Sequence, residues 1–72
     1  MSTYREGVLE YLTHKAEADK AAALASFDLL LNSAVGIGDH STDDLYKEFD
    51  NALNKLVDAE DRLSTLAKHF GA

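Results

Sequence analysis

The sequence predicts an all-α protein that folds as an antiparallel two-helix hairpin. The 72 residues contain no proline, so the chain lacks the residue that breaks helices most strongly. Apolar residues recur at helical spacing in both halves. Between the halves, Gly36 and Gly38 stand one residue apart, which marks a break in the backbone. We therefore expect a single helical-hairpin domain over residues 1–72, with helices at about 4–33 and 42–70 and a loop at about 34–41.

The first predicted helix begins near Thr3, whose hydroxyl has capping-box spacing to the carboxylate of Glu6. Lys20 points toward the apolar face of this helix, where its methylene stem packs while the ammonium reaches water. Leu24 and Leu31 lie at the edge of that face. The apolar face itself is formed by residues at helical spacing: Leu9, Leu12, Ala16, Ala23, Phe27, Leu30 and Ala34.

The second predicted helix has the clearest pattern. Ser41 supplies a capping hydroxyl at its start, and Lys68, His69 and Gly71 form a C-terminal signature. Its apolar residues follow one another at intervals of 4, 3, 4, 3, 4, 3 and 4 residues, the repeat of a helix that packs in coiled-coil geometry. They are Leu45, Phe49, Ala52, Leu56, Ala59, Leu63, Leu66 and Phe70.

The loop carries the chain's most site-like motif. Asp39, His40 and Ser41 are adjacent, but three consecutive residues cannot converge on one reacting atom as a nucleophilic triad must. We interpret Gly36, Gly38, Asp39 and Ser41 as a structural turn, in which the two polar side chains accept hydrogen bonds from backbone amides. No catalytic, cofactor-binding or metal-binding residue is assigned, and we expect the protein not to be an enzyme.

Charge excludes several classes of partner. Thirteen acidic against seven basic residues give a net charge of −6, so binding to nucleic acid or to an anionic membrane surface is disfavoured. No apolar run approaches the roughly 20 residues of a membrane span. The N-terminal residues lack the pattern of a signal peptide. The absence of cysteine also removes disulfides. A soluble cytoplasmic protein is the expectation.

Two long helices alone cannot cover all of their apolar surface. Val8, Tyr11, Leu53 and Val57 lie on the flanks of the predicted helices, where a second hairpin would shield them from water. We therefore expect a homodimer in which two hairpins form a four-helix bundle. The alternative is a single hairpin that docks onto a larger partner.

Two further functions remain open at the sequence level. The acidic residues of the second helix resemble phosphates in charge and suit a decoy that inhibits a nucleic-acid-binding protein, although interleaved lysines and arginine favour simple solvation. These acidic residues are Asp43, Asp44, Glu48, Asp50, Asp58, Glu60 and Asp61. A metal-binding bundle would use His14, Glu17 and His69, which the antiparallel hairpin brings toward one end. Solvated surface histidines are the simpler interpretation.

The segment from Leu29 to Ser41, with its Val-Gly-Ile-Gly-Asp-His turn, is followed by an acidic helix that contains residues 56–63. This combination resembles a family of short accessory proteins of large tailed phages, including marine ones. The resemblance covers roughly residues 8–66. It implies a phage origin, a host cytoplasm as the setting, and a host or phage protein as a partner. The family has no assigned function, so no functional residue is carried over.

Overall fold

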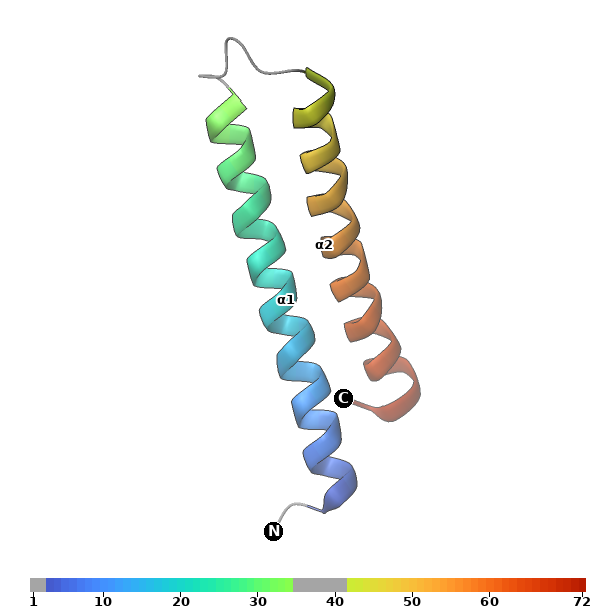
Figure 1. Ribbon diagram of the computed structural model, residues 1–72. Coiled ribbons are helices and arrows are strands. Elements are labelled where there is room, and N and C mark those ends of the chain that lie inside the picture. The colour runs from blue at the N-terminus through green and yellow to red at the C-terminus, as the bar shows by residue number, and fades with distance from the viewer. Residues whose placement is uncertain (1–2, 35–41) are drawn as a thin grey trace.

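The protein is a hairpin of two antiparallel α-helices in the computed structural model, which describes residues 3–34 and 42–72. Helix α1 spans Tyr4–Ala34 and helix α2 spans Thr42–Phe70. The two helices lie side by side, and the first turn of α1 is at the same end as the last turn of α2 (Figure 1). The molecule measures 56 × 19 × 12 Å. This confirms the predicted hairpin, whereas the predicted turn of Gly36, Gly38, Asp39 and Ser41 lies outside the described residues.

Both outer helix ends are capped as the sequence predicts. The backbone N–H of Glu6 donates to the Thr3 hydroxyl at 3.1 Å, and the Thr3 N–H donates to the Glu6 carboxylate at 3.4 Å. This reciprocal pair is a capping box. At the other end, Gly71 has a φ of 67° and its N–H donates to the Ala67 carbonyl at 3.2 Å. A glycine in this left-handed conformation ends α2 without steric strain.

The face that α2 turns toward α1 is the predicted one. Seven of the eight residues in the coiled-coil repeat are buried or half-buried, and only Phe70 is exposed. Phe70 is the last residue of α2. The helix therefore offers no further turn to cover its ring, which instead meets the imidazole of His69 edge-on at a centroid separation of 6.3 Å.

The face that α1 turns toward α2 differs from the prediction at one position. Leu12 is exposed, and the half-buried residue between Leu9 and Ala16 is Thr13. Apart from Asp19, which is also half-buried, the least exposed residues of α1 then follow the same alternation of four and three as those of α2. They are Leu9, Thr13, Ala16, Lys20, Ala23, Phe27 and Leu30. Two of these are polar, and the Thr13 hydroxyl is buried with no hydrogen-bond partner, so part of this contact stabilises the hairpin weakly.

The buried core of the described residues is small. It comprises Ala16, Ala23, Ala52, Ala59 and Leu66. Phe27 and Phe49 add an edge-on aromatic pair with centroids 5.3 Å apart. Alanine removes little apolar area from water compared with leucine or phenylalanine, but it lets the helix backbones approach closely. The two helices therefore lie close together, but their contact buries little apolar area.

Neither described helix contains a stretch that is long and apolar enough to cross a lipid bilayer.

Candidate interaction surface

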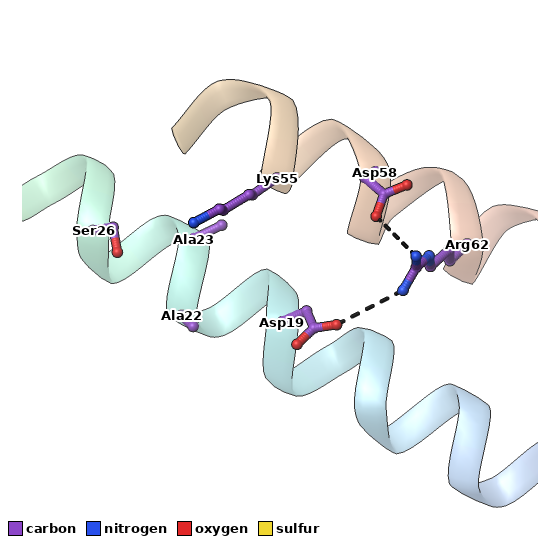
Figure 2. A pocket seen from close by; sticks show the side chains of 7 residues that line it. All are labelled: Asp19, Ala22, Ala23, Ser26, Lys55, Asp58 and Arg62. Atoms are coloured by element: carbon purple, nitrogen blue, oxygen red, sulfur yellow. Dashed lines mark ion pairs between the residues drawn. The ribbon is translucent and has the colours of Figure 1, made fainter. Parts of the chain in front are cut away.

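One side of the hairpin is polar near its middle. The Arg62 guanidinium of α2 reaches Asp58 on its own helix at 3.3 Å and Asp19 of α1 at 3.9 Å. These groups border an open groove of about 460 Å³ whose floor includes Ala22 and Ala23. Figure 2 shows Arg62 between the two carboxylates. Each member of these pairs is about half exposed, so each pair contributes roughly 0–1 kcal/mol to stability.

The chemistry of this polar groove is limited. Ser26 is the one hydroxyl among its lining residues, and no histidine or cysteine lines the groove beside it. A nucleophilic serine needs an adjacent base within hydrogen-bond reach. Lys55 extends from α2 toward α1 across the groove (Figure 2). The lining residues thus supply two cations and two carboxylates, which balance each other.

The opposite side of the hairpin is apolar near the loop end. Leu24 and Leu53 each follow a buried alanine by one residue, whereas Asp19 and Arg62 each precede a half-buried residue by one. In an antiparallel pair of helices, the residues that follow these buried positions lie on one side of the pair, and the residues that precede the half-buried positions lie on the other side. Five large side chains on the Leu24 side are exposed, and we call them the apolar strip. The strip consists of Leu24, Leu31, Tyr46, Leu53 and Val57.

Toward the free ends of the helices, the same side becomes acidic. Glu10, Glu17 and Glu60 occupy the positions that continue the strip, and all three are exposed. The Lys20 ammonium lies 3.7 Å from the Glu60 carboxylate. Carboxylates therefore border the strip toward the free ends of the helices, with one lysine at this boundary.

The four residues predicted to mediate association are all exposed, but they divide between two surfaces. Leu53 and Val57 belong to the apolar strip. Val8 and Tyr11 lie near the start of α1, on the side that faces away from α2. Leu24, Leu31 and Tyr46 are exposed beside Leu53 and Val57 but are not among the four predicted residues. Their position one residue after a buried or half-buried residue is the signal that identifies them.

The structure does not support the two alternative functions, metal binding and acidic mimicry of nucleic acid. Within residues 3–34 and 42–72, no group of three or more histidine, aspartate or glutamate side chains is arranged to hold a metal ion. His14, Glu17 and His69 thus do not form such a cluster. The acidic residues of α2 are mixed with cations, because Asp58 pairs with Arg62 and Glu60 with Lys20.

The chain matches no protein-family model, and neither a curated protein nor a solved structure matches it significantly.

Proposed function

We propose that this chain is a non-enzymatic protein–protein interaction module that associates with itself. The observation that carries the proposal is an imbalance between buried and exposed apolar side chains. In the described residues, leucine contributes one buried side chain and alanine the other four, while eleven large hydrophobic residues are exposed. A hairpin of this kind gains stability when another helical surface covers its exposed apolar residues.

The apolar strip is the surface that best supports association. Its five side chains are between 46% and 61% exposed. They come from both helices, so a second hairpin laid on this side contacts two helices at once and forms a four-helix bundle. An apolar patch on a monomer typically measures about 300–600 Å². Two such patches in contact bury about 600–1,200 Å², which is at or below the lower limit of stable interfaces.

Acidic mimicry of nucleic acid is the weaker proposal. A decoy needs a surface of one sign, but Arg62 of α2 and Lys20 of α1 pair with two of the carboxylates of α2. The phage origin, the host cytoplasm and a host or phage protein as a further partner rest on the resemblance of the loop segment alone.

Thermal unfolding followed by circular dichroism at several protein concentrations tests self-association. When folding is coupled to dimer formation, the melting temperature rises with concentration. For a chain of this size we expect a rise of about 5 °C for each tenfold increase. A melting temperature that stays constant across a hundredfold range would rule out the coupling and with it the proposed function.

A further inference from the structure

Two carboxylates lie beside the middle of the apolar strip, one on each helix. On α1, Asp28 follows Leu24 by four residues and precedes Leu31 by three. On α2, Asp50 follows Tyr46 by four residues. Both aspartates are exposed. Because residues three and four positions apart are neighbours on the surface of a helix, each carboxylate borders the strip from its own helix.

The two carboxylates lie at the same level along the hairpin. Asp28 follows Phe27 and Asp50 follows Phe49. The rings of these two phenylalanines meet with their centroids 5.3 Å apart. Within residues 3–34 and 42–72, neither aspartate has an ion-pair partner. Each long edge of the strip therefore carries a negative charge near its middle.

This placement makes a second copy of the chain a poor match for the edges of the strip. When two strips face each other about a two-fold axis, either each aspartate lies opposite its own counterpart, or Asp28 lies opposite Asp50 of the other copy. Like charges that meet across an interface weaken it. The area that two strips bury is already at or below the lower limit of stable interfaces. A second copy thus covers the apolar side chains but leaves the bordering charges uncompensated.

We infer that the apolar strip binds an amphipathic helix of another protein, with basic residues on both flanks of its apolar face, more tightly than it binds a second copy. The strip is formed by two helices that lie side by side, so a third helix packs along it. Val57 lies eleven residues after Tyr46, which makes the strip about 16 Å long, or about three helical turns. Leucines of the third helix cover the strip, and lysines or arginines on its two flanks pair with Asp28 and Asp50.

The other charges on this side of the hairpin favour the same partner. Toward the free ends of the helices, Glu10, Glu17 and Glu60 continue the acidic border. Two lysines lie nearby: Lys20, which pairs with Glu60 at 3.7 Å, and Lys47 in the second turn of α2. The carboxylates of this side therefore outnumber its lysines, whereas the polar groove on the opposite side has as many cations as carboxylates. The inference rests on the proposed role as a protein–protein interaction module, but not on self-association.

Fluorescence anisotropy of a labelled synthetic peptide tests the inference. The probe is a peptide of about 18 residues, long enough to form an isolated helix, with leucines at positions i, i+3, i+4 and i+7 and lysines on both flanks of this apolar face. A control peptide keeps the leucines and carries glutamate at every lysine position. We expect the lysine peptide to bind about tenfold or more tightly than the glutamate peptide. Equal affinities, or a lysine peptide that does not bind, would overturn the inference.

Matched substitutions locate the bound peptide. Asp50→Asn is expected to weaken binding of the lysine peptide about three- to fivefold. Asp61→Asn removes the same charge from another exposed position of α2 and should change the affinity less than about twofold. Leu53→Ala is expected to weaken binding about fivefold or more, and Leu29→Ala, which truncates an exposed leucine outside the strip, to leave it nearly unchanged. Circular dichroism establishes that each variant remains helical. Equal losses within either pair would assign binding to net charge or to another surface and contradict the inference.

Sedimentation velocity with and without the lysine peptide separates this inference from the proposed self-association. Because both occupants need the strip, we expect saturating peptide to convert dimers into single chains that each carry one peptide. Dimers that keep the peptide bound would place it elsewhere and rule out the inference. A chain that stays monomeric at every concentration, but binds the peptide with the losses described above, would refute self-association and leave the inference standing. Dimers that form without any affinity for the lysine peptide would do the reverse.

Discussion

Replacing Val57 by glutamate is expected to weaken dimer formation by on the order of 100-fold or more. Val57 lies in the apolar strip, 46% exposed in the single hairpin. A second copy that covers the strip would place the new carboxylate in an apolar contact without a partner cation. The single hairpin, by contrast, keeps that carboxylate in water. The dissociation constant from analytical ultracentrifugation should therefore rise, while the helical signal at high concentration changes little.

Asn54→Glu is the matched control for this prediction. Asn54 is an exposed residue of the same helix, three positions before Val57, and its substitution by glutamate adds the same charge. We expect its dissociation constant to stay within about threefold of the unmodified chain, because surface substitutions usually change free energies by less than 0.5 kcal/mol or so. Equal weakening by both substitutions would attribute the effect to net charge and would remove the strip from the interface.

Replacing Ala59 by leucine is expected to destabilise the hairpin itself by about 1–3 kcal/mol. Ala59 is 1% exposed, and the close approach of α1 and α2 leaves no room for three more carbon atoms. A chain of 72 residues has a free energy of unfolding of roughly 4–11 kcal/mol, so this loss is a large fraction of the total. Urea denaturation measures it as a lower midpoint.

Ala67→Leu is the comparison for Ala59→Leu, because Ala67 is exposed in the same helix. It makes the same change of side chain where space is open, and we expect the urea midpoint to remain close to that of the unmodified chain. If Ala59→Leu also left the urea midpoint unchanged, close packing at the buried alanines would not set the separation of the two helices. The explanation that self-association compensates for a small buried core would then be wrong.

The fold could be predicted from the sequence because the helical spacing, the glycine break and the capping residues all indicate the same hairpin. The repeat in α2 is unbroken, and its surroundings are charged, so only one face of this helix suits burial. Helix α1 is harder to read, since apolar residues occur on most of its faces. Leu12 and Thr13 both satisfy the interval between Leu9 and Ala16, and hydrophobicity favours the wrong one. Which of the two is half-buried depends on how α1 faces α2, and α1 alone does not carry that information.

The apolar strip was only partly predictable for a related reason. Leu53 and Val57 were identified because they flank a well-defined repeat on α2. Leu24 and Leu31 join them only when the antiparallel arrangement sets the flank of α1 beside that of α2. Val8 and Tyr11 are exposed as expected, but they lie on the face of α1 that no part of α2 reaches. The four residues that were predicted to form one surface therefore lie on two separate surfaces.

Sedimentation equilibrium of the unmodified chain tests most directly the claim that a second copy completes this hairpin. The chain has a mass of 7.9 kDa. The account predicts a particle of twice that mass at high concentration, which approaches the mass of one chain on dilution. A well-folded particle that keeps the mass of one chain at every concentration would contradict it.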